Sequence, residues 1–318
     1  WSPLSKTLKL LGKYSNLANL FFIFKIYRLY MIIGVIGSGG REHAICKKIL
    51  ESKKVKKLYC FPGNAGTSSI ATNVEVEIGD FDKIKDFTIN NKIDLLVVGP
   101  EKPLVDGIVD FFQKHNIKIF GPEKIASQLE GSKIFTKKLC KKYKIPTAKF
   151  GIFYKRNQAI YFLKKRNFPL VVKADGLAAG KGVYICENIE MAKNAVNEIF
   201  DDKFGRAENI LIEEFLIGEE MSYFIVSDGK TFKKFGTAQD HKRVLEGDKG
   251  KNTGGMGAYS PSRLINNNLD KKIINKIIKP TIKGLNNMGS KFVGFLYAGL
   301  MIIKNEPYLI EYNVRMGD

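Results

Sequence analysis

The sequence predicts a protein of the α/β and α+β classes, in which a doubly wound parallel sheet precedes a second region of mixed strands and helices. Three observations lead to this prediction. From Met31 onward, short apolar runs alternate with helical segments. Glycine or Gly-Pro follows several of these runs, and this alternation is typical of a parallel sheet. After residue 122 the regular alternation ends, so we expect a different architecture from there on.

The first region should place its binding residues at the carboxyl ends of its strands, where doubly wound sheets bind ligands. The predicted strands are 31–37, 57–61, 92–100 and 117–122, and the predicted helices are 43–50 and 104–115. The turns that follow the strands are 37–43, 62–67 and 99–104.

The second region combines long helices with hairpins. The predicted helices are 132–145, 156–166, 191–200 and a segment near 270–287. The predicted strands are 150–153, a glycine-rich hairpin over 171–186, 209–216, a hairpin over 222–236 that turns at Asp228-Gly229, 292–303 and 307–314. A long polar loop is expected over 239–263.

Composition favours a cytoplasmic protein that binds small anions. The 318 residues are 44% hydrophobic and carry a formal charge of +20, with lysines spread along the chain. There is no arginine-rich tract, zinc-finger spacing or aromatic RNA-binding strand, so we expect no nucleic-acid partner. The four cysteines form no CxxC pair, which argues against a zinc site or a disulfide framework.

Residues 1–30 differ from the rest, because they carry five basic side chains, no acid and an apolar patch over 20–24. The patch is short for a signal peptide. A basic membrane-surface helix and an organellar presequence remain alternatives. We expect an extraneous or disordered segment, with Met31 as the working start. No stretch is long and apolar enough to span a membrane, so no membrane partner is expected.

The segment 171–183 is the strongest candidate for a phosphate site. Small residues let the backbone approach an anion closely, and lysines neutralise it. The segment is not a P-loop, since Val183 stands where Ser or Thr is required. A mobile surface turn would explain the glycines but not the lysines. The expected phosphate-binding residues are Lys173, Gly176, Ala179, Gly180, Lys181 and Gly182.

A second glycine-rich turn, GSGGREH at 37–43, places Gly39, Gly40 and Arg41 at a helix N-terminus. Backbone N–H groups and a guanidinium suit a phosphate monoester. A dinucleotide site is disfavoured, because the full GxGxxG pattern and the acidic residue about twenty positions later are missing.

Acidic residues mark two further strands. Glu213, Glu214, Glu219 and Glu220 form either a solvated edge or a receptor for a nucleoside. On the last strand Glu311, Asn313 and Arg315 share one face. Carboxylate and amide oxygens suit Mg²⁺ or Mn²⁺, and the arginine suits a transferring phosphoryl group. A polar edge face is the alternative.

Ten segments, in order, resemble the glycinamide ribonucleotide synthetase (phosphoribosylamine–glycine ligase) family. They are GSGGREH, PGNAGT, GPEKPLVDG, EGSKIFTK, KADGLAAGKGV, EEFLIGEE, QDHKR, NTGGMGAYSP, GFLYAGLM and EYNVRMGD. The resemblance implies an N-terminal domain at 31–130 and an ATP-grasp domain at 131–318, with a mobile lid subdomain near 150–216. It also implies ATP-dependent joining of glycine to 5-phosphoribosylamine through glycyl phosphate, by a monomer or weak oligomer.

The same resemblance implies roles for individual residues. ATP would contact Lys133, Lys173, the 175–182 loop, Glu213, Phe215, Leu216 and Glu220, and the metal would bind Glu311 and Asn313. The other substrates would lie near Gly39, Gly40, Arg41, Glu42, Gly63, Asn64, Gly66, Thr67, Asp240, His241, Lys242 and Arg243. We expect catalytic roles for Arg315, Lys173 and Asp240.

The chain departs from the family pattern in two ways. Met316 stands where the family usually has Phe, and the resemblance implies a further C-terminal domain that would begin beyond Asp318. Two alternatives therefore stay open, namely another ATP-grasp carboxylate–amine ligase and an inactive nucleotide-binding fragment.

Overall fold

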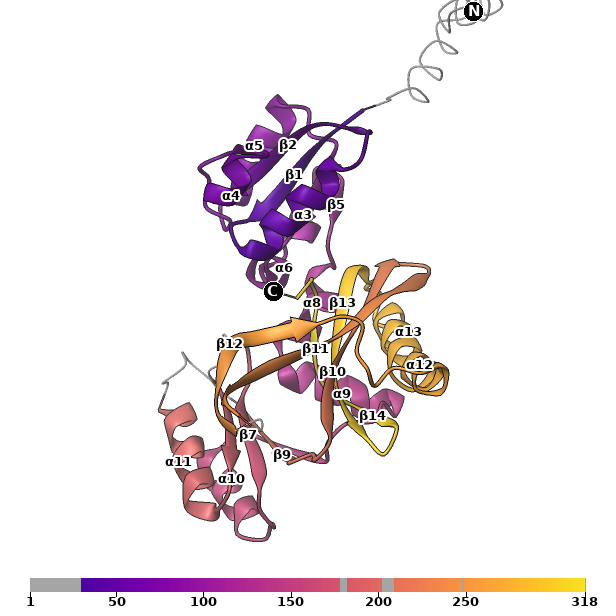
Figure 1. Ribbon diagram of the computed structural model, residues 1–318. Coiled ribbons are helices and arrows are strands. Elements are labelled where there is room, and N and C mark those ends of the chain that lie inside the picture. The colour runs from indigo at the N-terminus through magenta and orange to yellow at the C-terminus, as the bar shows by residue number, and fades with distance from the viewer. Residues whose placement is uncertain (1–29, 178–181, 202–208, 247–248, 318) are drawn as a thin grey trace, which may run out of the picture.

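A computed structural model describes residues 30–177, 182–201, 209–246 and 249–317. The described residues form three sheets, with the parallel sheet at one end, the five-stranded antiparallel sheet in the middle and the four-stranded antiparallel sheet at the other end (Figure 1). Across the described residues, no helix has the length and apolar character needed to cross a membrane.

The N-terminal sheet is parallel throughout and has the order β3-β2-β1-β4-β5, which confirms the doubly wound prediction. The order reverses between β1 and β4, so the carboxyl ends of these two strands border the expected ligand crevice. The strands are β1 (Met31–Gly37), β2 (Val55–Pro62), β3 (Thr72–Asn73), β4 (Leu95–Val98) and β5 (Ile119–Phe120). The helices are α3 (Gly40–Leu50), α4 (Ala65–Ser68), α5 (Phe81–Asn90), α6 (Glu101–Asp106) and α7 (Ile108–Lys114).

Two helix predictions in this region need correction. The predicted helix 104–115 is two helices, because Gly107 takes a left-handed conformation (φ 100°) that ends α6 and starts α7. The predicted helix 43–50 begins three residues earlier, at Gly40, since the glycine-rich turn forms its first turn. Helices α4 and α5 and strand β3 are additional to the predicted elements.

A four-stranded antiparallel sheet, β6-β9-β7-β8, forms a separate unit with its own apolar core. Helices α10 and α11 pack on it (Figure 1). Two helices, α8 (Lys124–Gly131) and α9 (Lys133–Tyr143), precede this unit. Its elements are β6 (Phe150–Phe153), α10 (Arg156–Leu163), β7 (Leu170–Ala174), β8 (Val183–Cys186), α11 (Ile189–Phe200) and β9 (Ile210–Glu214).

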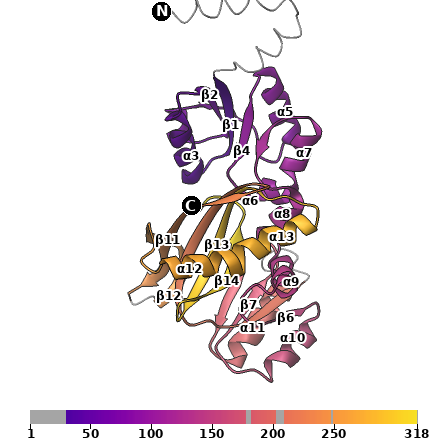
Figure 2. The same ribbon diagram turned by 90° about the vertical axis from the view of Figure 1, so that its right-hand side faces the viewer.

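The third sheet is antiparallel and has the order β12-β11-β10-β13-β14. Helices α12 and α13 lie across one face of it (Figure 2). The strands are β10 (Glu219–Asp228), β11 (Phe232–Leu245), β12 (Lys249–Tyr259), β13 (Val293–Ile303) and β14 (Glu306–Asn313). The helices are α12 (Asn267–Ile273), the π-helical η1 (Ile274–Ile278) and α13 (Lys279–Asn287).

The predicted helix near 270–287 is therefore interrupted by a π-helical turn. Pro280 follows that turn and has no N–H to donate to the preceding turn, which favours such a change in hydrogen bonding.

The predicted loop over 239–263 is wrong for most of its length, because β11 and β12 pair there as a hairpin. Asp240 lies opposite Ala258 and His241 opposite Gly257. Gly255 and Gly257 have φ of 130° and 158°. A glycine-rich strand lacks the alternation of apolar and polar side chains that identifies strands in a sequence, which explains the error.

Candidate active site

A cavity of about 300 Å³ lies between the four-stranded and the five-stranded antiparallel sheets. Val171 and Ile185 line it from the first sheet, and Met301 and Leu309 line it from the second. Lys173, Glu220 and Glu311 add charged groups to its wall. Apolar walls with a few polar groups are typical of small-ligand sites, and two facing apolar walls suit a flat aromatic ring.

Lys173 lies at this cavity within a buried ion-pair triad. Glu213 Oε2 is 2.7 Å from Lys173 Nζ, and Glu213 Oε1 is 2.6 Å from Lys137 Nζ. Burial disfavours the ammonium of Lys173, but the Glu213 carboxylate outweighs it and raises the pKa of Lys173. Burial also opposes ionisation of Glu213, yet the two lysines lower its pKa. Lys173 is therefore a fixed cation beside the cavity.

Glu213, one of the expected ATP contacts, belongs both to the cavity lining and to the ion-pair triad. Its carboxylate holds the two lysines. Lys137 was missed by the sequence analysis, although it follows Lys133 by four residues on the same helix face. Burial lowers the pKa of Lys137 despite the contact with Glu213.

The glycine-rich loop begins directly beside helix α9. Lys133 Nζ donates to the carbonyl of Gly176 at 2.9 Å, and burial lowers the pKa of Lys133. Asp175 accepts from Ser132 Oγ and from the backbone N–H of Ile134, so it ties the loop to the helix N-terminus. Gly182 is buried at the other end of the loop. Three predicted phosphate-binding residues lie outside the described residues, namely Ala179, Gly180 and Lys181.

The connection from β9 to β10 lines the same cavity. Phe215 and Leu216 of this connection border it, together with Glu220 of β10. Gln239, which the sequence analysis missed, fixes this edge because its Nε2 donates to the carbonyl of Glu220 at 3.1 Å. Predicted ATP contacts from three strands, β7, β9 and β10, therefore line one cavity.

Glu311 and Asn313 lie two residues apart on β14, opposite Gly299 and Tyr297 of β13. A Cβ at position 299 would come 3.2 Å from Glu311 Cγ, so glycine leaves the carboxylate room beside the cavity. Within the described residues no group of three His, Cys, Asp or Glu side chains gathers as a closed metal site. One carboxylate and one amide fit Mg²⁺ or Mn²⁺ completed by phosphates and water.

The two N-terminal turns lie against each other. The Asn64 side chain donates to the carbonyls of Ser38 and Gly39, at 2.8 and 3.1 Å, and accepts from Thr67 N–H. Gly63 has φ 79°, which favours glycine, and a Cβ at Gly66 would come 2.7 Å from His43 Nδ1. The turns at 37–43 and 62–67 are therefore in direct contact.

Glu42 is buried beneath these turns and does not face solvent. Its carboxylate accepts from the Gly39 N–H at 2.7 Å and from Arg41 Nε at 2.8 Å. A Cβ at Gly99 would come 2.0 Å from Glu42 Oε1, so the glycine after β4 makes room for the carboxylate. Glu42 thus positions Gly39 and Arg41, the residues on either side of Gly40.

The predicted substrate residues on β11 fall in two places. Asp240 lines the cavity between the two antiparallel sheets. His241 is exposed and stacks on Tyr259 with ring centroids 6.1 Å apart. The backbone of Lys242 and Arg243 belongs to β11, and their side chains lie outside the description.

Arg315 lies just after β14, and the segment that follows this strand runs beside α6 (Figures 1 and 2). Its Nε donates to Glu101 Oε2 at 3.2 Å, and its Nη2 is 3.1 Å from Glu130 Oε1. Burial raises the pKa of Glu130 to about 7, despite the opposing charge of Arg315. Sequence reasoning missed Glu101 and Glu130, because nothing in their spacing relates them to residue 315.

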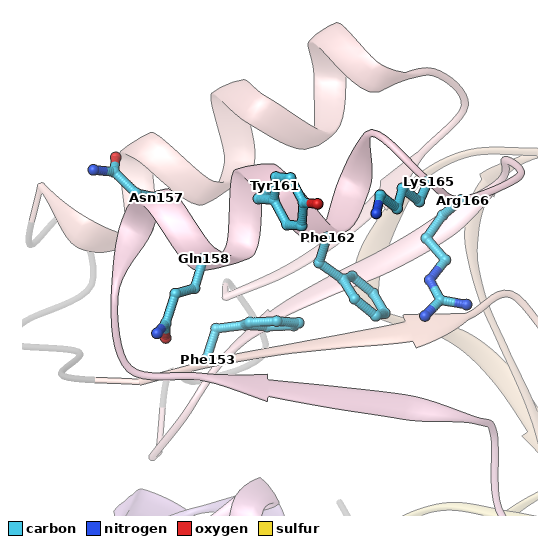
Figure 3. A pocket seen from close by; sticks show the side chains of 7 residues that line it. All are labelled: Phe153, Asn157, Gln158, Tyr161, Phe162, Lys165 and Arg166. Carbon is cyan, nitrogen blue, oxygen red and sulfur yellow. The ribbon is translucent and has the colours of Figure 1, made fainter.

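Figure 3 shows a second cavity, of about 460 Å³, on the surface of β6 and α10. None of the predicted site residues lines it. The Arg166 guanidinium lies 4.1 Å from the centre of the Phe162 ring there. Its lining is Phe153, Asn157, Gln158, Tyr161, Phe162, Lys165 and Arg166.

The two antiparallel sheets that enclose a lysine- and glutamate-lined cavity define an ATP-grasp protein. Residues 131–318 match the ATP-grasp (A) domain of phosphoribosylglycinamide synthetase, and residues 31–130 match its N domain. The chain therefore belongs to the phosphoribosylglycinamide synthetase family, whose members are ATP-dependent ligases.

Relatives and solved structures agree with this membership. The phosphoribosylamine–glycine ligases of Mesorhizobium japonicum and Escherichia coli K12 are 49% and 47% identical, over 89% of this chain and 67% of theirs. The chain spans about two thirds of the length of the curated relatives it matches. The crystal structure of the Thermotoga maritima phosphoribosylamine–glycine ligase has a TM-score of 0.78 and 35% identity, over 90% of this chain and 69% of that one. An ADP complex of Staphylococcus aureus N5-carboxyaminoimidazole synthetase shares the fold, with a TM-score of 0.69 and 16% identity.

Proposed function

We propose that this protein joins glycine to 5-phosphoribosylamine at the expense of ATP, with glycyl phosphate as intermediate. The observation that carries the proposal is the meeting of Lys173, Glu220 and Glu311 at one apolar-walled cavity. A carboxylate is a poor acyl donor, so the γ-phosphoryl group of ATP first passes to a glycine carboxylate oxygen and ADP leaves. The amine of phosphoribosylamine then attacks the acyl carbon, and phosphate departs as the amine loses a proton.

The residues of this chain act by positioning and electrostatics, since no protein nucleophile is required. Lys133 and Lys173 hold phosphate oxygens, Glu220 receives the ribose hydroxyls, and Phe215 and Leu216 border the adenine. Glu311 and Asn313 hold Mg²⁺ or Mn²⁺, which supplies charge neutralisation for the triphosphate when bound. Arg41, Asn64 and the backbone of the two N-terminal turns, together with Asp240 to Arg243, lie toward phosphoribosylamine and glycine.

We further propose that 31–130 acts as the substrate domain and 131–318 as the ATP-grasp domain. Within the latter, 150–216 serves as a lid, supported by the separate core of the four-stranded sheet. Closure over glycyl phosphate would exclude water. The protein would act in the cytoplasm as a monomer or weak oligomer, without nucleic acid or membrane partners.

A coupled assay of ADP release in the complete protein tests this function. We expect turnover only when glycine, phosphoribosylamine and a divalent metal are all present, and we expect Glu311→Ala to lose the metal-dependent turnover. The matched control is Glu51→Gln, which removes an exposed ion pair with Lys48 far from the cavity. Turnover with a different carboxylate or amine would instead assign another ligase activity, and nucleotide binding without ADP release would indicate an inactive nucleotide-binding protein.

A further inference from the structure

Two arginines from distant parts of the chain share the same acceptors. Arg41 Nη1 and Arg315 Nη1 both donate to the carbonyl of Met316, at 3.2 and 3.1 Å. Glu101 Oε2 accepts from Arg315 Nε at 3.2 Å and lies 4.0 Å from Arg41 Nη2. Arg41 belongs to the proposed phosphate turn, and Arg315 follows the strand of the proposed metal ligands, so Glu101 lies between two parts of the site.

Three carboxylates hold these two guanidinium groups together. Glu42 pairs with Arg41 at 2.8 Å, and Glu130 pairs with Arg315 at 3.1 Å. The side chains of Glu42 and Glu130 are 2% and 8% exposed, whereas that of Glu101 is 34% exposed. Each arginine therefore has its own buried carboxylate, and the shared one is the most accessible.

The contact between Arg41 and Glu101 is also the longest in the cluster. At 4.0 Å, and with the Glu101 side chain 34% exposed, this contact contributes little to stability. A substrate phosphate that binds at the 37–43 turn can therefore attract Arg41 away from Glu101 at small cost. The Glu101 charge would then act on Arg315 alone and hold its guanidinium more firmly beside β14.

We propose that Glu101 is a positioning residue that couples the phosphoribosyl site to the nucleotide site, an inference that rests on the proposed function. Binding at Arg41 changes the pairing of Arg315, which lies four residues beyond Glu311. Because coupling between sites is reciprocal, each ligand then changes the affinity for the other by the same factor.

Calorimetric titration of the complete protein tests the coupling. The probes are adenylyl imidodiphosphate with Mg²⁺, which does not transfer its γ-phosphoryl group, and ribose 5-phosphate. In the wild type we expect ribose 5-phosphate to change the nucleotide Kd by at least about 5-fold, and the reverse experiment to give the same factor. In Glu101→Gln both ligands still bind, but the factor falls to about 2-fold or less.

Two further variants separate coupling from a purely structural role. Glu101→Asp keeps the charge and should restore part of the coupling, while Glu51→Gln should leave it unchanged. A purely structural role would weaken both affinities in Glu101→Gln and preserve their ratio, which would overturn the inference. Absence of coupling in a wild type that binds both probes would also overturn it. If the wild type bound neither probe, the proposed function would fail as well.

Discussion

The site contains two clusters in which one carboxylate lies between two cations, and they differ in almost every physical respect. In the lysine triad, Glu213 contacts Lys137 and Lys173 at 2.6 and 2.7 Å, and all three side chains are less than 8% exposed. In the arginine cluster, Glu101 contacts Arg315 and Arg41 at 3.2 and 4.0 Å and is 34% exposed.

The difference indicates two uses of charge. A buried ion pair is costly to form and very costly to break, so the lysine triad is a fixed arrangement. Its net positive charge is preorganised for an anion, and no rearrangement is needed when a phosphate arrives. The arginine cluster is looser, and guanidinium groups offer several donors, so partners can be exchanged there.

The largest effect is expected from removing the central carboxylate of the lysine triad. Glu213→Ala leaves two buried ammonium groups without their partner, and we expect it to lower the free energy of unfolding by about 3–5 kcal/mol. Urea denaturation followed by circular dichroism measures this loss. Glu51→Ala, which removes the exposed pair with Lys48, should change the same quantity by no more than about 1 kcal/mol. If the two variants lost equal free energies of unfolding, the lysine triad would not be the fixed arrangement described above.

A pH-dependent effect is expected from Glu130, which is buried against Arg315. Its folded-state pKa of about 7 exceeds the ordinary 4.5, so the folded protein is stabilised by this group below pH 4.5 and loses that contribution as the pH rises toward 7. Glu130→Gln cannot lose a proton there. The free energy of unfolding of the variant, relative to the wild type, should therefore rise by roughly 3 kcal/mol across this range.

The measurement is a series of urea titrations of both proteins at fixed ionic strength. A relative stability that is flat between pH 4.5 and 7 would show that the buried carboxyl keeps its ordinary pKa. The variant retains an amide oxygen that can accept from the Val314 N–H, so the comparison mainly tests the charge.

Substitution of Lys173 tests whether the lysine triad binds the phosphates of ATP. Lys173→Ala removes a charged donor from the cavity, and we expect the ATP Kd to rise by about 10- to 100-fold, in line with the 1.5–3 kcal/mol of a hydrogen bond to a charged group. Titration calorimetry with Mg-ATP measures the change. Wild-type affinity in this variant would remove Lys173 from the phosphate site.

The sequence was sufficient to predict the features that depend on local pattern. The alternation after Met31 predicted the parallel sheet, and family motifs indicated the strands that carry Lys173, Glu220 and Glu311 to one cavity. What it missed depends on contacts between distant segments. Glu101 and Arg315 are 214 positions apart, and no periodicity relates them. The prediction of a loop over 239–263 is wrong because glycines at paired strand positions leave no alternation of apolar and polar side chains.

The smallest effect on stability is expected from substitution of Glu101, the partly exposed carboxylate of the arginine cluster. Glu101→Gln leaves Arg315 paired with Glu130 and Arg41 paired with Glu42, so neither guanidinium loses its last carboxylate. We therefore expect the free energy of unfolding to fall by less than about 1 kcal/mol, against several for Glu213→Ala. Urea denaturation of the two variants under identical conditions makes the comparison. A loss at Glu101 as large as that at Glu213 would mean that the arginine cluster is as fixed as the lysine triad, and an exchange of partners on substrate binding would then be too costly.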